Sequence, residues 1–250
     1  DGDTQIQVSQ LDYSSYLGII GIGRIKRGTL KVNQQVTVLG ADGSKRNGKV
    51  GQVFTYLGLE RIDTQEANAG DIIAFTGLGE LKISDTICAP NNLEALPPLQ
   101  VDEPTVTMTF QVNTSPFAGK EGKFVTSRQI LERLTHELKH NVALRVEETE
   151  DGDKFKVSGR GELHLGVLIE NMRREGFELA VSRPEVIMKV VDGQKMEPIE
   201  NVTIDVEEQH QGSIMEKMGE RKAEMTNMQP DGKGRIRMDF QMPSRGLIGF

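Results

Sequence analysis

The sequence predicts a multidomain chain in which an all-β part is followed by α+β parts. Residues 1–97 hold short strand-like runs separated by turn signals such as "ADGS" and "EANAGD". The segment "ALPPLQVDEP" then interrupts this pattern with three prolines. After it, strand-like and helix-like segments alternate, and the same order of elements starts again near residue 198. We therefore expect three domains, at residues 1–97, 102–184 and 185–250.

The first domain is predicted to be a small closed β-barrel. Runs such as "QQVTVL", "GQVFTYL" and "GDIIAFTGL" have the length and composition of strands, and glycines stand at the corners between them. Many short strands at close spacing favour a closed barrel.

Residues 102–184 are predicted to form a ferredoxin-like βαββαβ domain. The run "TVTMTFQV" alternates as a strand does, and a helical face made of Ile130, Leu131, Leu134 and Leu138 follows the expected N-cap, Ser127. A hairpin with the turn "TEDGD" comes next, and the helix "ELHLGVLIENMRREG" ends at a glycine. The strand "FELAVS" completes the order of a split βαβ sandwich.

Residues 185–250 are predicted to be an incomplete second ferredoxin-like domain. "NVTIDVEE" reads as a strand, "GSIMEKMGERKA" as a helix, and "EMTNMQPDGKGRIRMDFQMP" as a hairpin. The next helix would start at Ser244, close to the last residue, so we expect one sheet edge to lack a partner. Because the chain also starts with Asp1 rather than methionine, we expect it to be a piece of a longer protein.

Composition narrows the class of protein. The single cysteine, Cys88, cannot form an internal disulfide, fits a reducing cytosol and is expected to be buried. No apolar run approaches the roughly 20 residues of a membrane span, and no signal-peptide pattern leads the chain. The net charge of −7 argues against a surface that binds nucleic acid everywhere. These features predict a cytoplasmic protein without membrane contact.

His136 to His140 read H-E-L-K-H, which is the spacing of zinc-protease helices. The apolar stripe of the same helix consists of Leu131, Leu134, Leu138 and Val142. At roughly 100° per residue, the two histidines lie about 200° from that stripe, so we expect them to face solvent. Glu132 and the acidic hairpin are the nearest candidates for a third ligand. A zinc metallopeptidase is therefore a rival hypothesis, which predicts one bound zinc per chain and proteolysis that Glu137→Gln abolishes.

Two glycine-rich runs resemble nucleotide-binding loops only superficially. "GKEGKF" has Phe124 where a P-loop requires Ser or Thr, and Phe117 where its first glycine belongs. "VSGRGELHLG" has His164 in place of the third glycine of G-x-G-x-x-G, and its unit is not a βαβ half. No Asn-Lys-x-Asp guanine-reading stretch is present. We therefore expect this chain to bind no nucleotide cofactor and to have no catalytic activity.

Basic residues gather locally although the chain is acidic. No acid occurs between Asp12 and Asp42. The candidate RNA contacts of the first domain are Arg24, Lys26, Arg27 and Lys31 in this stretch, and Lys45, Arg46 and Lys49 in the neighbouring hairpin. In the α+β part they are Lys120, Lys123, Arg128, Arg160, His164 and Arg245. Cations that replace the counterions of phosphates would give RNA binding that weakens steeply with salt.

Alternatives to RNA contact stay open for these residues. Each cluster taken alone is compatible with an ordinary solvated surface. Arg160 is equally compatible with an ion pair to Glu162 or to the acidic hairpin. Arg245 stands at the start of the last expected helix and would contact either RNA or a domain outside this chain.

Longer segments carry a resemblance to the translational GTPases. "GIGRIKRGTLKVNQQV" and "AGDIIAFTGLG" look like their β-barrel second domain. "VSGRGELHLGVLIENMRREGFEL" is similar to the third-domain signature of the elongation factor G group, and "VTIDVEEQHQGSIMEKMGERKAEM" resembles that group's fifth domain. Elongation factor G has a further domain between these two, whereas here only a short linker separates them.

The group without the intervening domain contains the BipA/TypA family of ribosome-binding translational GTPases and its LepA-like relatives. "NTSPFAGKEGKF", "RVEETEDGDKFKVSGRGELHL" and "PSRGLIGF" look like the BipA/TypA family, and the last of these speaks against a LepA-like protein. The resemblance spans essentially all 250 residues. It places "LTHELKH" in the first helix of the third domain, where it implies packing and docking rather than zinc chemistry.

The resemblance implies a non-catalytic middle segment of a ribosome-associated GTPase. Ribosomal RNA and ribosomal proteins are the implied partners, with the barrel on small-subunit RNA and the other domains near the factor-binding region of the large subunit. GTP and magnesium would belong to a GTPase domain outside this chain, and contact with tRNA to a C-terminal domain outside it. The family is linked to large-subunit assembly and to growth in cold or stress. A rigid spacer without its own ribosome affinity is the remaining alternative, and no oligomeric state is predicted.

Overall fold

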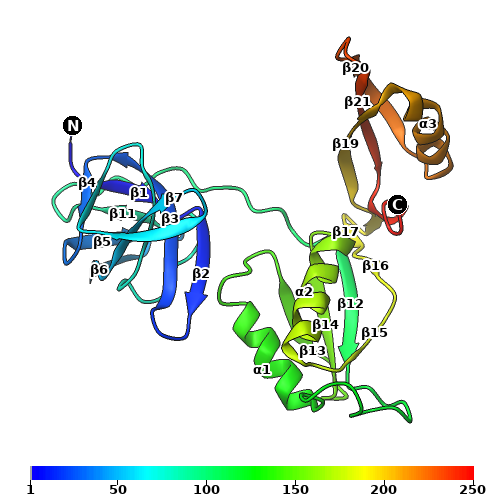
Figure 1. The fold of residues 1–250 in the computed structure, drawn as a ribbon, viewed down its shortest axis with the longest axis horizontal. Helices are drawn as coiled ribbons and strands as arrows, with labels where there is room; N and C mark the ends of the chain where they lie inside the picture. The colour runs from blue at the N-terminus through cyan, green and yellow to red at the C-terminus, as the bar shows by residue number, and fades with distance from the viewer. Residues whose placement is uncertain (1) are drawn as a thin grey trace. The chain divides into compact units, whose positions relative to one another are not determined.

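The computed structural model describes residues 2–250 and consists mostly of strands (Figure 1). Contacts divide the chain into one unit of Asp1–Val101 with Leu134–Val142 and another of Asp102–Arg133 with Ala143–Phe250. The chain is thus a multidomain protein of β and α+β parts, whereas the predicted boundaries at residues 97 and 184 stay predictions. Within the described residues, no helix combines the length and the apolar character that crossing a bilayer requires.

The first unit is built from short strands that follow one another closely. They are β1 (Gln5–Gln7), β2 (Gln10–Ser14), β3 (Gly18–Arg27), β4 (Thr29–Lys31), β5 (Gln35–Leu39), β6 (Lys45–Lys49), β7 (Val53–Leu57), β8 (Glu60–Thr64), β9 (Glu66–Asn68), β10 (Ile72–Phe75) and β11 (Thr86–Cys88). The three strand-like runs noted in the sequence correspond to β5, β7 and β10.

Strand β3 organises this unit because it pairs along both of its edges. Its first half pairs with β2 and β10, and its second half pairs with β1. A Cβ atom on Gly23 would lie 2.1 Å from the carbonyl oxygen of Gln7, so glycine is needed where the two segments approach. The strand order is β6-β5-β11-β1-β3-β10-β7-β8. Residues 50–52 connect β6 to β7, and their backbone is hydrogen-bonded to Asn33 and Gln34 on one side and to Thr76 on the other. Backbone hydrogen bonds therefore continue around the curled sheet, as the predicted barrel requires.

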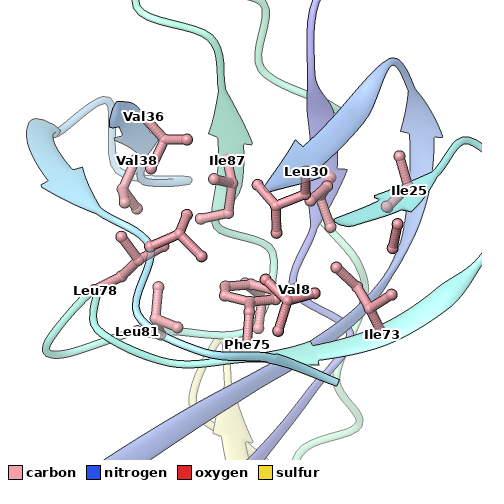
Figure 2. Packing of buried hydrophobic residues seen from close by; sticks show 14 residues of the cluster. Val8, Ile25, Leu30, Val36, Val38, Ile73, Phe75, Leu78, Leu81 and Ile87 are labelled. Carbon is pink, nitrogen blue, oxygen red and sulfur yellow. The ribbon is translucent and has the colours of Figure 1, made fainter. Parts of the chain in front are cut away.

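Apolar side chains from many strands fill the centre of this curled sheet (Figure 2). Val8, Leu30, Ile73 and Phe75 are completely buried there. Burial of one such side chain stabilises a fold by roughly 1.5–3 kcal/mol, so this core contributes strongly to holding the strands together. Cys88 is also buried, as predicted, and burial raises the pKa of its thiol.

The following part of the chain has the predicted succession of strand, helix, hairpin, helix and strand. Its elements are β12 (Val106–Gln111), α1 (Ser127–Glu137), β13 (Arg145–Glu148), β14 (Lys154–Gly159), α2 (Glu162–Glu175), β15 (Ala180–Val181) and β16 (Glu185–Val186). Strand β12 is central, since it pairs with β14 on one side and with β15 and β16 on the other. The resulting order is β13-β14-β12-β15.

The end of α2 lies where the sequence predicted it, whereas the cap of α1 lies one residue earlier than predicted. The α1 cap is Thr126 rather than Ser127, because the Thr126 hydroxyl accepts from the Gln129 N–H while the Gln129 side chain accepts from the Thr126 N–H. This reciprocal pair is a capping box. Gly176 ends α2 with φ of 96°, a left-handed conformation that glycine adopts without strain.

Residues 189–250 contain a hairpin that the sequence did not suggest, followed by a small sheet with one helix. These elements are β17 (Lys189–Val191), β18 (Gln194–Met196), β19 (Ile199–Glu207), η1 (Glu208–His210), α3 (Gln211–Glu220), β20 (Glu224–Pro230), β21 (Arg235–Pro243) and η2 (Ser244–Gly246). The sheet order is β19-β21-β20, so β19 and β20 are the edge strands among the described residues. Met218 of α3 packs with Met238 and Phe240 of β21 in the core of this sheet.

Candidate nucleic-acid interface

Two predicted contact arginines of the first unit, Arg27 and Arg46, hold parts of that unit together. The Arg27 guanidinium donates to a backbone carbonyl at 3.0 Å and to the Glu94 carboxylate at 2.9 Å, and its side chain is only 29% exposed. The Arg46 guanidinium donates to the carbonyl oxygens of Leu78 and Glu80. Because these donors already bind protein acceptors, their first role is structural.

Arg24 and Lys31 are also engaged, but at the surface. The Arg24 Nε donates to the Gly70 carbonyl at 3.1 Å, and the Lys31 ammonium lies 3.2 Å from the Glu66 carboxylate. Exposed ion pairs contribute only about 0–1 kcal/mol, so a phosphate can replace such a partner at little cost.

Lys26, Lys45 and Lys49 are exposed, and no ion pair or hydrogen bond of their ammonium groups occurs within residues 2–250. Lys45 and Lys49 alternate with the inward Arg46 along β6, so they lie on the opposite face of that strand. Lysines on an edge strand also discourage pairing with another chain. The structure thus places these three cations where solvent, and any RNA, reaches them.

Lys120, Lys123 and Arg128 lie near one another in sequence, between β12 and the first turn of α1, and all three are exposed. The Lys120 ammonium lies 4.8 Å from the ring centre of Phe117. Arg128 donates to the Glu132 carboxylate at 2.9 Å, one helical turn along α1. The structure therefore brings two lysines and one aromatic ring onto the same loop, and it pairs the arginine locally.

Arg160 and His164 belong to the tight turn that starts α2. The His164 Nδ1 accepts from the Arg160 N–H at 3.1 Å, which gives the imidazole a structural role. The Arg160 side chain is exposed, and no ion pair with Glu162 or with the acidic hairpin occurs in the part of the chain that the structure describes. Of these two candidates, only Arg160 presents its charge to solvent.

Arg245 is held by an ion pair in the last 3₁₀ turn. Its guanidinium donates to the Glu197 carboxylate at 2.7 Å. This contact raises the pKa of Arg245 and lowers the pKa of Glu197. Contact with RNA would have to displace this carboxylate.

The zinc-like motif does not have the geometry of a protease helix. Helix α1 ends at Glu137, so His140 lies in a turn rather than one helical turn after His136. The rings of the two histidines are 6.2 Å apart, and within the first unit the His136 ring meets Tyr13 edge-on at 4.6 Å. Both histidines are half-buried, which corrects the prediction that they face solvent. The described residues contain no group of three His, Cys, Asp or Glu side chains able to hold a metal.

The predicted apolar stripe of the same helix is also only partly correct. Leu134 is completely buried, but Leu138 and Val142 are 38% and 45% exposed because the helix has ended before them. The prediction was partly wrong because it applied the helical period to residues after Glu137, which form a turn.

Glu178, which the sequence reading missed, organises the loop of the "GKEGKF" motif. Its carboxylate accepts backbone N–H groups of Gly119 at 2.8 Å, Glu121 at 3.2 Å and Gly122 at 3.0 Å, and the Asn113 side-chain amide at 2.8 Å. These bonds lower its pKa to about 2. Converging backbone N–H groups are the device that P-loops use for phosphate. Here they hold a carboxylate of the protein itself.

Two glycines allow these backbone N–H groups to converge on Glu178, an arrangement that we call the Glu178 nest. Gly119 has φ of 78°, and a Cβ atom on Gly122 would lie 2.5 Å from the Cβ of Glu178. The Gly-x-x-Gly spacing was therefore the available sequence signal. It indicated an anion nest but did not reveal that the anion is internal.

Chemically, the site is a set of exposed ammonium groups on ordered backbone. Such groups bind phosphate oxygens as point charges and carry no base-specific information. The arginines are mostly bound to carbonyls and carboxylates of the protein. The arrangement fits a docking surface rather than a reaction centre.

Comparison with known proteins finds translation-factor domain models and close relatives. Residues 18–88 match the model of elongation factor Tu domain 2, and residues 194–250 match the model of the elongation factor G C-terminus. The chain is 73%, 72% and 68% identical over all 250 residues to the large ribosomal subunit assembly factor BipA of Salmonella typhimurium LT2, Escherichia coli K12 and Haemophilus influenzae, respectively.

The chain spans about two fifths of these curated relatives, namely 41% of the length of each. The two matched models are parts of translation factors, and they fall in the first and last predicted domains. High identity over every residue, together with these two models in this order, leads to one assignment: the chain belongs to the BipA family.

Proposed function

We propose that this chain is the ribosome-docking segment of a BipA-type large-subunit assembly factor. In this proposal residues 1–97 are the translation-factor β-barrel, residues 102–184 a ferredoxin-like domain and residues 185–250 part of a second one. The segment holds ribosomal RNA and proteins, and it relays the nucleotide state of a GTPase domain outside this chain. GTP and magnesium belong to that domain, and the protein acts in the cytoplasm, with roles in translation and stress adaptation.

One observation carries the proposal most directly. In a chain of net charge −7, exposed lysines on β3, on β6 and in the loop before α1 make no ion pair or side-chain hydrogen bond within residues 2–250. Lysine ammonium groups on ordered backbone bind phosphates, and their binding is weakened by salt. The name that the relatives carry, large ribosomal subunit assembly factor, indicates which phosphate-rich partner to test first.

Co-sedimentation of the chain with purified large and small ribosomal subunits, at low and moderate salt, tests this function. We expect pelleting with at least one subunit that weakens steeply as salt rises. Charge reversal of Arg24 and Lys26, with the structural Arg27 left unchanged, should reduce pelleting without lowering the melting temperature. Charge reversal of Lys222 and Lys233, two lysines outside the proposed surface, is the matched control and should leave pelleting unchanged.

Two other outcomes would replace the proposal. No pelleting at any salt would show that the segment is a rigid spacer. Ribosome binding by the longer relatives would then have to come from the parts that this chain does not span. One stoichiometric zinc per chain together with proteolysis that Glu137→Gln abolishes would revive the peptidase hypothesis.

A further inference from the structure

The loop between β12 and α1 is fixed in one conformation from two sides. Continuing the β12–β15 ladder by two residues places Asn113 opposite Glu178, so the carboxylate stands where the loop leaves the sheet. Three backbone N–H groups of the loop then converge on Glu178. The loop is therefore wrapped around a side chain of the sheet that it connects.

A second set of contacts fixes the end of the same loop. The N–H groups of Lys123 and Phe124 both donate to the Gly176 carbonyl, and the Glu178 N–H donates back to the Phe124 carbonyl at 3.0 Å. The rings of Phe124 and Phe177 lie 4.8 Å apart. The loop thus has little freedom left to lose when a partner binds, which favours affinity.

The outer side of this ordered loop presents an aromatic ring. Phe117 is 67% exposed, so its ring is accessible on this loop. The Lys120 ammonium lies 4.8 Å from the ring centre, and Lys123 is exposed three residues later. A stacking face is therefore combined with two cations on one rigid support.

This combination fits RNA better than an apolar protein surface. The outward charged groups are Lys120, Glu121 and Lys123, with a net charge of +1, while the Glu178 oxygens are occupied by N–H donors. Unpaired bases stack on exposed aromatic rings, and lysines beside the ring reach the adjoining phosphates. An apolar protein partner would instead leave these ammonium groups desolvated.

We propose that Phe117 stacks on an unpaired base of ribosomal RNA while Lys120 and Lys123 contact the neighbouring phosphates. Glu178 is the positioning residue that holds the loop in the presenting conformation. This inference rests on the proposed function and adds to it the kind of RNA element that is recognised and the residues that recognise it.

Photocrosslinking identifies the occupant directly. The chain carrying p-benzoylphenylalanine at position 117 is irradiated with purified ribosomal subunits, and the adduct is treated with ribonuclease or with protease. The same photoreactive residue at position 190 is the matched control, because Val190 is 69% exposed on β17 in the same unit and is not next to a candidate contact. We expect an adduct at position 117 that ribonuclease shortens, and a weaker adduct or none at position 190.

Affinity measurements separate the roles of the ring and of the nest. Phe117→Ala should weaken binding to the subunits by roughly 5- to 100-fold, the usual effect of removing one stacking side chain, whereas Phe117→Trp should retain it. Glu178→Gln should weaken binding similarly and speed amide hydrogen exchange at Gly119 and Gly122. Faster exchange with unchanged affinity would show that Glu178 is structural only and would overturn its positioning role.

The outcomes distinguish this inference from the proposed function. Salt-sensitive pelleting of the unchanged chain, with a position-117 adduct to a ribosomal protein or with full affinity in Phe117→Ala, would overturn the inference and leave the function standing. No pelleting of the unchanged chain would overturn both.

Discussion

The first unit and the loop before α1 both contain lysines and glycines, but different groups hold each of them together. In the first unit, Arg27 and Arg46 turn toward carbonyls and a carboxylate of the protein, and neighbouring lysines stay in solvent. In the loop before α1, the backbone turns inward around Glu178 and the lysines point outward. In the first unit the arginines therefore belong to the scaffold and only the lysines are available for the proposed docking, whereas in the loop the scaffold is made by the backbone.

The difference reflects the chemistry of the two cations. A guanidinium offers five donors in a planar fork and satisfies several carbonyl oxygens at once, so a folded chain readily incorporates it. An ammonium on a flexible stem is strongly hydrated and stays in water. Arginines near strand turns are thus weak candidates for RNA contact in this chain, and exposed lysines are stronger ones.

The largest expected effect comes from breaking the arginine scaffold. Arg46→Gln removes hydrogen bonds that join β6 to the carbonyls of Leu78 and Glu80, and it should lower the free energy of unfolding by about 2–3 kcal/mol. Lys45→Gln on the same strand should change it by less than about 0.5 kcal/mol, because its ammonium is exposed. Urea unfolding of both variants measures the contrast. Equal stability losses would show that the two cations do not differ in role.

A smaller loss of stability is expected when a methyl group is added inside the Glu178 nest. The methyl group of Gly122→Ala would lie 2.5 Å from the Cβ of Glu178, so the loop must move, at a cost of about 1–2 kcal/mol. Gly166→Ala is the matched control, since no atom lies within 4 Å of a Cβ at that position on α2. Thermal unfolding should show a lower melting temperature for Gly122→Ala only. A melting temperature unchanged from that of the parent chain would mean that the loop is not held as described.

The smallest expected effect distinguishes a carboxylate held by backbone N–H groups from a carboxylate held by an ion pair. The pKa of Glu178 and the pKa of Glu170 are both lowered to about 2, Glu178 by backbone N–H donors and Glu170 by Arg173 and Arg174. Salt screens exposed charges more than it weakens hydrogen bonds. Carboxyl ¹³C titration should therefore show that added salt raises the Glu170 midpoint and leaves the Glu178 midpoint in place. Equal movement of both midpoints would contradict the nest.

The lowered pKa also fixes the direction of the pH dependence. Because the folded-state pKa of Glu178 lies below its ordinary value of 4.5, its contribution to stability is complete above about pH 4.5. That contribution declines as the pH falls toward about 2. The amides of Gly119 and Gly122 should accordingly stay protected from hydrogen exchange throughout the range around pH 7.

Strand and helix positions were predictable from the sequence because hydrophobic period and turn residues are local signals. The hairpin that turns before β21 and the glycine that ends α2 are examples. The cap of α1 was misplaced by one residue because Ser127 and Thr126 are equally good caps in sequence, and only the reciprocal bond with Gln129 decides between them. The prediction that both histidines face solvent was wrong because Tyr13 packs against the His136 ring and because His140 lies beyond the end of α1 at Glu137.

The site was less predictable than the fold. Exposure of Lys26, Lys45 and Lys49 agreed with the charge pattern, but Arg27 and Arg46 were placed inward by partners far along the chain. Long-range hydrogen bonds leave no periodic trace in a sequence. For the same reason, the pairing of the "GKEG" glycines with Glu178, more than fifty residues away, emerged only from the structure.

The salt dependence of binding to purified ribosomal subunits tests the central claim most directly. The unchanged chain is compared with a variant in which Lys26, Lys45, Lys49, Lys120 and Lys123 are replaced by glutamine, after equal melting temperatures have been verified. Each lost phosphate contact should reduce the slope of log K against log salt by roughly 0.7–0.9, so we predict weaker binding with a clearly shallower slope. Identical slopes and affinities would show that the exposed lysines do not dock the chain and would contradict the account.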